Sequence, residues 1–282
     1  MKILVTGAKG MLGRTLLRIL GREHSIFPAD LPETDILDEK TLDAAFAAFK
    51  PDAAVHCAAF TNVDRCESEP EAAFRLNRDG TGNVARACAK HSSRLVAIST
   101  DYVFGGDSDV PYRESDRPAP RTVYGKSKLA GEEEALAALP SAAILRIAWL
   151  YGAGGPSFVH TMAKLGAAGG PPLKVVDDQR GNPTSCEAVA SAVSFILGRG
   201  IEGVVHGTCE GICSWFDLAR ETFSLLGIER AVAPCTTAEF PRPAPRPANS
   251  ALENTVLAGA GFEMPHWKDA LKEFARNEFS RP

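Results

Sequence analysis

The residues best suited to chemistry lie within one stretch, residues 99–128. Tyr124 and Lys128 are four positions apart, so a helix would place both side chains on one face. A free phenol titrates near about pH 10, and we expect the ammonium of Lys128 to lower that pKa by favouring the phenolate. Such a tyrosine can donate a proton to a carbonyl oxygen, while the hydroxyl of Thr100 holds the same oxygen. These residue types therefore predict reduction at a carbonyl carbon.

Two predicted elements must bring these side chains together. Thr100 follows the apolar run at 95–98, which is typical of a buried strand whose carboxyl end delivers polar side chains. Tyr124 opens a helix that is predicted to end at Leu139. The Tyr-x-x-x-Lys spacing is common by chance, so its interpretation depends on a cofactor site elsewhere in the chain.

A dinucleotide site is predicted at the N-terminus. Residues 2–6 form a short β-rich run, and glycines at 7, 10 and 13 open the amphipathic helix that follows. Glycines here let the backbone approach a pyrophosphate, and the helix N-terminus attracts its charge. The spacing is G-x-x-G-x-x-G instead of the common G-x-G-x-x-G, and an ordinary strand-to-helix turn stays an alternative interpretation.

An acidic residue is expected at the adenosine ribose. Asp30 follows the strand predicted near residues 25–27 and lies 23 positions after Gly7 (30 minus 7), where such an acid bonds the ribose hydroxyls. Asp35 and Ile36 follow in a loop. Either aspartate can equally be a plain loop or helix-capping residue.

The alternation of strands and helices predicts an α/β fold, a Rossmann-type doubly wound parallel sheet with a smaller C-terminal substrate-binding lobe. Residues 1–150 form the predicted NAD(P)-binding domain, and 185–208 return to its sheet. Residues 151–184 and 209–282 form the predicted lobe. The catalytic crevice is expected between the two parts, at the carboxyl ends of the strands.

Composition limits the partners and the location. The net charge is −4 without a basic cluster, which argues against nucleic acid and anionic membranes. No apolar run approaches the roughly 18 residues of a membrane span, and the chain opens on a strand instead of a signal peptide. The seven cysteines are an odd number scattered among predicted core elements, which indicates reduced thiols and a cytoplasmic protein.

Two sequence patterns resemble known binding sites. His206, Cys209 and Cys213 lack a fourth ligand at a recognised zinc spacing, so no metal is predicted. The proline-rich residues 241–247 resemble a polyproline ligand. Their place between lobe elements favours an ordered loop in which Arg246 faces the cleft.

Seven motifs occur in a characteristic order. They are residues 7–13, AAFTNVD at 58–64, STDYVF at 99–104, YGKSKLAGE at 124–132, RIAWLYG at 146–152, DQRGNPT at 178–184 and RPANS at 246–250. Together they resemble the motifs of the extended short-chain dehydrogenase/reductases, and more closely those of the dTDP-4-dehydrorhamnose reductase family. The resemblance covers essentially the whole chain.

The resemblance implies NAD(P)H-dependent reduction of the 4-keto group of a dTDP-linked 6-deoxyhexose, most directly dTDP-4-dehydro-L-rhamnose to dTDP-L-rhamnose. It implies that Tyr124 protonates the oxygen, that Lys128 holds the nicotinamide ribose, and that Thr100 orients the keto group. Trp149 would offer a flat apolar face to the sugar ring. The substrate contacts that it implies are Val63, Thr100, Asp101, Tyr124, Trp149 and Arg246.

The expected cofactor site combines the residue patterns with the resemblance, in which Asn77 matches an asparagine on the helix behind the cofactor. The residues expected there are Gly7, Lys9, Gly10, Met11, Leu12, Gly13, Asp30, Asp35, Ile36, Ala58, Ala59, Thr61, Asn77, Ser99, Tyr124 and Lys128.

Two positions depart from the family. Its members mostly favour NADPH, yet Asp30 without an adjacent arginine suits NAD(H), while Lys9 can reach a 2′-phosphate. NADP(H) is expected, and NAD(H) stays open. Some members dimerise through Mg²⁺ held by a glutamate on the first helix, where this chain has Thr15. We therefore expect no such metal site, and a homodimer stays open.

Two other classes stay open. A nucleotide-sugar dehydratase or epimerase would share Tyr124 and Lys128, but a dehydratase usually has an Asp-Glu pair after the threonine. Here Asp101 is followed by Tyr102, which weighs against a dehydratase. A non-catalytic nucleotide-sugar-binding subunit would be expected to have lost Thr100, Tyr124 or Lys128, and all three are present.

Overall fold

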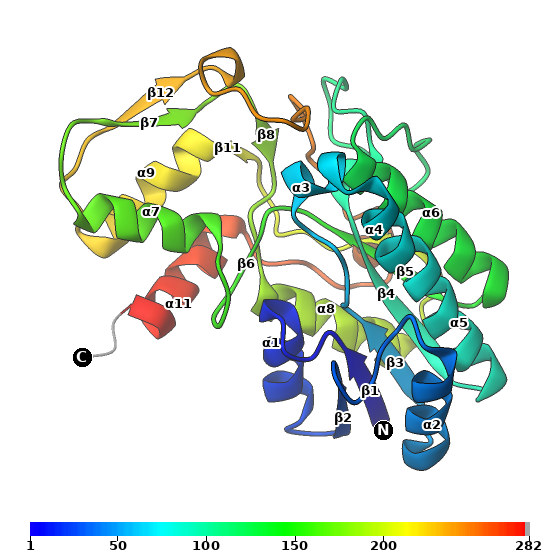
Figure 1. Cartoon of the computed structure of the whole chain (residues 1–282). Helices are drawn as coiled ribbons and strands as arrows, with labels where there is room; N and C mark the ends of the chain where they lie inside the picture. The colour runs from blue at the N-terminus through cyan, green and yellow to red at the C-terminus, as the bar shows by residue number, and fades with distance from the viewer. Residues whose placement is uncertain (280–282) are drawn as a thin grey trace.

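The computed structural model describes residues 1–279 and has a six-stranded parallel sheet at its centre (Figure 1). In order across the sheet, the strands are β10 (Gly203–His206), β5 (Ala143–Ile147), β4 (Arg94–Thr100), β3 (Ala53–His56), β1 (Lys2–Thr6) and β2 (Ser25–Ala29). β1 pairs with β2 on one side and with β3 on the other, so the chain changes direction across the sheet at this point. A crevice forms at the carboxyl ends of strands where the order reverses. The predicted doubly wound α/β fold is confirmed.

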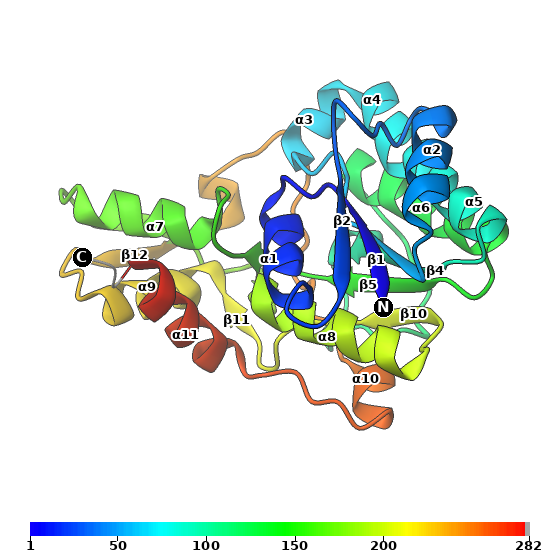
Figure 2. The same ribbon diagram turned by 90° about the horizontal axis from the view of Figure 1, so that it is seen from below.

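Helices cover both faces of the sheet (Figure 2). α1 (Met11–Leu20) and α8 (Cys186–Arg199) pack on the face that includes Ile3 and Val5. α2 (Glu39–Phe49), α5 (Gly80–Lys90) and α6 (Val123–Ala138) pack on the face that includes Leu4. Successive side chains of a strand point to opposite faces, so a strand buried on both sides is apolar throughout. This explains the continuous apolar runs in the sequence.

The segment between β3 and α5 is less regular than a single helix. It forms α3 (Val63–Ser68), α4 (Pro70–Phe74) and a π-helical turn, η1 (Arg75–Asp79). Asn77 lies in this turn, and its backbone carbonyl is so close to Gly131 of α6 that a Cβ there would lie 2.2 Å from the oxygen. A π-turn widens the helix by one residue, and such turns are frequent at functional sites. The helix continues from α4 through this wider turn into α5.

The chain beyond β5 builds a second apolar cluster. β7 (Leu173–Val176) pairs in parallel with β12 (Val232–Cys235), and α7 (Phe158–Ala167) and α9 (Trp215–Leu226) pack beside them (Figure 1). The cluster contains Met162, Val175, Ala219 and Phe223. Two small strand pairs join this part to the rest, β6 (Leu150–Tyr151) with β9 (Thr184–Ser185) and β8 (Arg180–Gly181) with β11 (Cys213–Ser214).

The last elements return to the main core. α10 (Thr255–Gly259) is short, and the residues before it are extended, because residues 249 and 252 form bridges with Arg180 and Tyr112. α11 (Trp267–Phe279) places Leu271 and Phe274 in the same apolar cluster as α1 and α8. The remaining regular elements are the single turns η2 (Asp101–Val103) and η3 (Thr237–Glu239). Across residues 1–279, no helix combines the length and the apolar character that crossing a membrane requires.

Candidate active site

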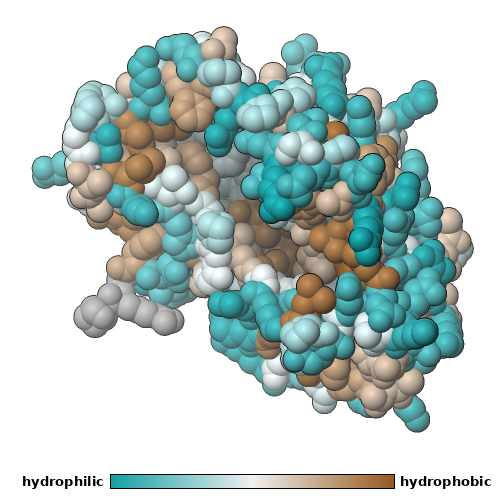
Figure 3. Space-filling view, in the orientation of Figure 1, coloured by the Kyte–Doolittle hydropathy of each residue, from teal (hydrophilic) through white to brown (hydrophobic). Residues whose placement is uncertain are grey.

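A cavity of about 880 Å³ lies at the carboxyl ends of β1 to β5. Figure 3 shows the molecule hollowed in this region, with apolar side chains on the floor of the hollow. Most of the predicted site residues line it. They are Gly7, Lys9, Gly10, Met11, Leu12, Gly13, Asp30, Asp35, Ile36, Ala58, Ala59, Thr61, Val63, Ser99, Thr100, Asp101, Tyr124, Lys128 and Trp149.

The glycine turn at one end of this cavity has the geometry that a pyrophosphate needs. Gly7 has a φ of 66°, and a Cβ there would lie 2.7 Å from the backbone nitrogen of Ala58. A Cβ on Gly13 would lie 2.2 Å from the carbonyl oxygen of Gly7. Gly10 caps α1 without any side-chain hydrogen bond, so the first N–H groups of the helix are available to an anion. These residues fit the phosphates of a dinucleotide.

Asp30 and Lys9 lie together beside the glycine turn. The carboxylate of Asp30 accepts hydrogen bonds from the backbone nitrogens of Lys9 (2.7 Å) and Leu31 (2.8 Å). The ammonium of Lys9 donates to the carbonyl oxygen of Leu31. A negative and a positive group therefore border the same part of the cavity. Asp35 also accepts from the backbone of Leu37, so it shapes its own loop as well as lining the cavity.

Lys128 lies at the floor of the cavity, on α6. Its side chain is buried, and its ammonium donates to the carbonyl oxygen of Ile98 on β4 at 2.7 Å. Burial lowers the pKa of Lys128 to about 8, and the negative charge of Glu132 opposes that shift. The ammonium thus stays charged at neutral pH, fixed between α6 and the sheet.

The pKa of Tyr124 moves in the direction opposite to our expectation. Burial raises it, a hydrogen bond with Thr100 partly opposes the rise, and the neighbouring Asp101 adds to it. The expected lowering by Lys128 was wrong, because removal of the phenol from water outweighs other effects and the ammonium is directed to Ile98. Tyr124 is therefore a neutral phenol at physiological pH, which is the form that can donate a proton.

Thr100 and Asp101 form a polar pair beside Tyr124. The hydroxyl of Thr100 donates to Oδ1 of Asp101 at 2.9 Å, while the other oxygen, Oδ2, is buried without a hydrogen-bond partner. Burial raises the pKa of Asp101 to about 6. An unpartnered carboxylate oxygen in a cavity is well suited to accept a hydrogen bond from a ligand hydroxyl.

A buried ion pair supports this polar cluster from behind. Arg146 on β5 donates to Glu132 on α6, with Nη2 2.6 Å from Oε2, and the two side chains are 3% and 5% exposed. The hydroxyl of Ser99 donates to the same carboxylate. This pair was not predicted, although both residues lie in the family motifs, because nothing in the local pattern indicates that they meet.

Two indole rings stack at the other end of the cavity. Trp149 and Trp215 have ring centroids 3.5 Å apart and planes inclined by 4°, and both line the cavity. Trp149 was predicted, and Trp215, the first residue of α9, was missed because it has no motif of its own. The cavity thus changes from a glycine and backbone surface at one end to an aromatic surface at the other.

Two predicted residues do not line the cavity. Asn77 is buried, accepts from the backbone nitrogen of Phe60 at 2.7 Å and donates to Ser127 at 2.9 Å, so it holds the loop after β3. Arg246 forms an ion pair with Asp64 of α3 at 2.8 Å, and its side chain is 15% exposed. Its Nη1 is buried without a partner, which leaves one donor group unused.

The family assignment follows from comparison over the whole chain. A family model described as the RmlD substrate binding domain matches residues 1–279. The chain belongs to this family. The resemblance stated from the motifs is therefore confirmed.

Individual members of the RmlD family are similar over nearly their full length. The dTDP-4-dehydrorhamnose reductase of Mycolicibacterium smegmatis is 41% identical over 278 residues, covering 96% of this chain and 84% of that protein. A probable dTDP-4,6-dihydroxy-2-methyloxan-3-one 4-ketoreductase of Streptomyces antibioticus is 43% identical over 279 residues, covering 97% and 94%. The crystal structure of dTDP-4-dehydrorhamnose reductase from Bacillus anthracis in complex with NADP has a TM-score of 0.95 at 36% identity, covering 98% and 99%.

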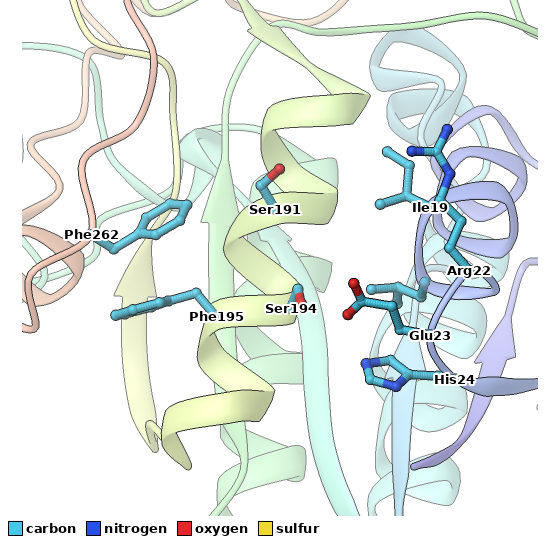
Figure 4. Close-up of a pocket in the computed structure, with 9 residues that line it drawn as sticks. Ile19, Arg22, Glu23, His24, Ser191, Ser194, Phe195 and Phe262 are labelled. Carbon is cyan, nitrogen blue, oxygen red and sulfur yellow. The ribbon is translucent and has the colours of Figure 1, made fainter.

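A second, smaller cavity of about 400 Å³ lies between the C-terminal end of α1, with the residues that follow it, and the middle of α8 (Figure 4). Its lining includes Glu23, His24, Ser194 and Phe195, and none of the predicted site residues.

The cluster of His206, Cys209 and Cys213, for which no metal was predicted, lies elsewhere in the molecule. There, Nδ1 of His206 hydrogen-bonds the carbonyl oxygen of Glu253. Among residues 1–279, no group of three or more His, Cys, Asp and Glu side chains is arranged to hold a metal ion.

Proposed function

We propose that this protein uses NADPH to reduce the 4-keto group of a dTDP-linked 6-deoxyhexose, most directly dTDP-4-dehydro-L-rhamnose to dTDP-L-rhamnose. The observation that carries the proposal is the convergence of Thr100, Tyr124 and Lys128 on one cavity with the glycine turn. The similarity to a reductase of that name over 96% of the chain supports the choice of substrate.

Each polar group has a distinct task in this proposal. A bound nicotinamide cofactor supplies the hydride. Tyr124, a neutral phenol, donates its proton to the substrate oxygen. Thr100 turns its hydroxyl proton from Asp101 to the same oxygen. Lys128 binds the nicotinamide ribose through its remaining ammonium protons. The free oxygen of Asp101 accepts a hydrogen bond from a sugar hydroxyl.

The remaining predicted contacts follow the same division. Asn77 acts indirectly, by fixing the loop that borders the cofactor. Val63 and Trp149 contact the sugar, and Arg246 extends its unused donor to the diphosphate. The predicted cofactor residues that line the cavity are proposed to contact the dinucleotide.

For the cofactor, we propose NADPH with NADH as an accepted substitute. The relative from Bacillus anthracis was crystallised in complex with NADP. Lys9 lines the cavity beside Asp30, and its ammonium is proposed to meet a 2′-phosphate. Asp30 lies in the same place and suits the unphosphorylated ribose. The two opposite charges therefore favour a permissive site.

A second candidate differs only in the sugar. The relative from Streptomyces antibioticus is as similar as the other and is named for another dTDP-linked ketosugar. A 4-ketoreductase acting on such a sugar would use the same catalytic residues. The choice therefore rests on the sugar end of the cavity.

We also propose the setting in which the enzyme works. Residues 1–150 with 185–208 bind the cofactor, and residues 151–184 and 209–282 bind the substrate. The enzyme is cytoplasmic, and any homodimer forms without a bridging metal, because Thr15 offers no carboxylate. Sedimentation in the presence and absence of EDTA tests the assembly, and a dimer that EDTA dissociates would contradict it.

The decisive experiment is NADPH oxidation with freshly generated dTDP-4-keto-6-deoxy sugars of both kinds. The proposal expects stoichiometric NADPH consumption and a reduced dTDP-sugar that contains the hydride at C4. An epimerase or dehydratase would change the sugar without net consumption of NADPH. A binding subunit would bind dTDP-sugar with no turnover, and either result would overturn the proposal.

A further inference from the structure

Trp149 adopts a backbone conformation that is rare for a residue with a side chain. Its φ is 46°, in the left-handed region that favours glycine. Residues stay in such conformations only when their surroundings hold them there, and they gather at ligand sites. The contacts that hold Trp149 therefore matter for whatever its ring binds.

Three contacts restrain the indole of Trp149. Its Nε1 donates to Oγ of Ser250 at 3.3 Å. Gly181 lies against the ring so closely that a Cβ there would be 2.5 Å from Cε2. Trp215 stacks on the ring at 3.5 Å. All three come from segments far along the chain, beyond residue 180.

Trp215 is itself held firmly. It is the first residue of α9, after Ser214, whose side chain completes a capping box with Asp217. Its Nε1 donates to Oε1 of Gln179 at 3.1 Å, and Phe158 packs on its ring at 4.6 Å. Since both indole N–H groups already have partners, the pair presents apolar ring surface to the cavity.

We propose that Trp215 is a positioning residue that holds Trp149 in place, so that the two rings form one wall selecting the hexose. The inference rests on the proposed function for the identity of the ligand. The C–H faces of a hexose pack well on aromatic rings, and no free indole donor remains to reward an additional hydroxyl. The selection of the sugar is thereby assigned to α9 as well as to the sheet.

The first test compares dTDP-L-rhamnose with dTDP by calorimetry on the cofactor-saturated protein. Trp215→Ala is expected to weaken dTDP-L-rhamnose about 3- to 10-fold and to leave dTDP unchanged, while Trp215→Phe, which keeps a stacking ring, changes both by less than about twofold. Equal weakening of both ligands, or of neither, would overturn the proposal. The proposal would also be overturned if the wild type bound dTDP-L-rhamnose no more tightly than dTDP, because the aromatic wall would then contribute nothing to sugar binding.

A spectroscopic test reports on the pair directly. Two stacked indoles whose transition dipoles are rotated relative to each other within the ring planes give a pair of oppositely signed circular dichroism bands. We expect Trp215→Ala to abolish the pair of bands that the wild type shows. Gly181→Ala should weaken them and also reduce dTDP-L-rhamnose affinity, because a methyl group would displace the Trp149 ring. Gly198→Ala is the matched control, since a Cβ there has no neighbour within 4 Å. Equal effects of the two glycine variants would contradict the inference.

These measurements use the product of the proposed reaction and a spectrum, so they do not require turnover. A wild-type protein that binds dTDP-L-rhamnose but oxidises no NADPH would disprove the proposed function and still test the role of Trp215. If the wild type turns over and Trp215→Ala binds dTDP-L-rhamnose as tightly as the wild type does, only the role of Trp215 is disproved.

Discussion

The two ends of the cavity are built in different ways. The end proposed for the cofactor, called the cofactor end, is built from backbone and small side chains, such as Gly7 and Ala58 after two neighbouring strands and Gly13 in α1. The end proposed for the sugar, called the sugar end, is built from large side chains that hold one another across the chain, such as Trp149 on Trp215. A site made of backbone changes only if the fold changes, whereas a site made of paired side chains changes by single substitutions. A sugar end that changes by single substitutions agrees with the finding that two relatives, about equally similar to this chain, are named for different sugars.

The largest expected effect lies where the two ends meet. Tyr124→Phe keeps the ring but removes the proton donor, so kcat should fall about 10²- to 10⁴-fold. Cofactor affinity, which belongs to the other end, should stay within about twofold, as measured by fluorescence titration of NADPH. A variant that retains more than about a tenth of the wild-type kcat would remove Tyr124 from its assigned role.

The next effect tests whether the sugar end includes the diphosphate. Arg246→Ala should weaken dTDP binding roughly 10- to 150-fold, because a charge-assisted contact contributes about 1.5–3 kcal/mol. Asp64→Asn is the matched control, since it breaks the ion pair with Arg246 while sparing the guanidinium. If Arg246 only anchors its loop, the two variants will weaken dTDP equally in calorimetric titration. If it binds phosphate, Asp64→Asn will stay close to wild type.

The pH profile of kcat/KM should have an alkaline limb from Lys128 at the cofactor end of the cavity and an acid limb from Asp101 at the sugar end. Lys128 loses its charge above its pKa of about 8, and Asp101 gains a proton below its pKa of about 6. We therefore expect kcat/KM to be highest between these values and to fall about tenfold per pH unit on either side. Asp101→Asn should remove the acid limb alone. An acid limb that persists in this variant would show that another group causes it.

Stability should respond to alkaline pH in the opposite sense. The folded state lowers the pKa of Lys128 from 10.5 to about 8, so between these values the unfolded chain binds more protons. Stability attributable to Lys128 must then increase as pH rises through this window. Urea unfolding of wild type and Lys128→Met at both limits measures the difference. If activity is lost above pH 8 while the urea midpoint does not fall, the loss comes from deprotonation of Lys128 and not from unfolding of the protein.

The smallest expected effect concerns cofactor choice. Asp30→Ala should shift the ratio of kcat/KM toward NADPH by about two- to fivefold, because it removes a half-buried charge that repels the 2′-phosphate. Lys9→Ala should shift the ratio toward NADH. Steady-state assays with both cofactors measure the shift, and an unchanged ratio for Asp30→Ala would mean that this carboxylate does not face the ribose.

What the sequence predicts follows the same division. The glycine spacing and the Tyr124–Lys128 pair are local patterns, so the turn and the catalytic helix could be predicted directly. The apolar runs that alternate along the chain with helical patterns predicted the parallel sheet. Trp215 and Ser250 meet Trp149 only through the tertiary structure, and the left-handed backbone of Trp149 has no signal in its neighbours.

The errors in prediction also have physical causes. The pKa of Tyr124 was judged from one neighbouring charge, whereas burial dominates it. Asn77 was expected at the cofactor, but the π-helical turn directs its amide to Phe60 and Ser127. Arg246, whose contact with the diphosphate stays a prediction, is held by Asp64, a partner that was not considered. In each case the deciding partner lies outside the local motif.

The packing of α1 on α8 has a consequence for synthesis in the cell. The apolar residues of α1, such as Leu12 and Leu16, share a cluster with Val189 and Val193 of α8, more than 160 positions later in the chain. Translation at about 5–20 residues per second leaves that surface uncovered for on the order of 10 seconds. Transiently exposed apolar surface makes a nascent chain prone to aggregation until the segment that covers it has been synthesised. α8 therefore protects the N-terminal half of the sheet during folding, although it contributes no side chain to the larger cavity.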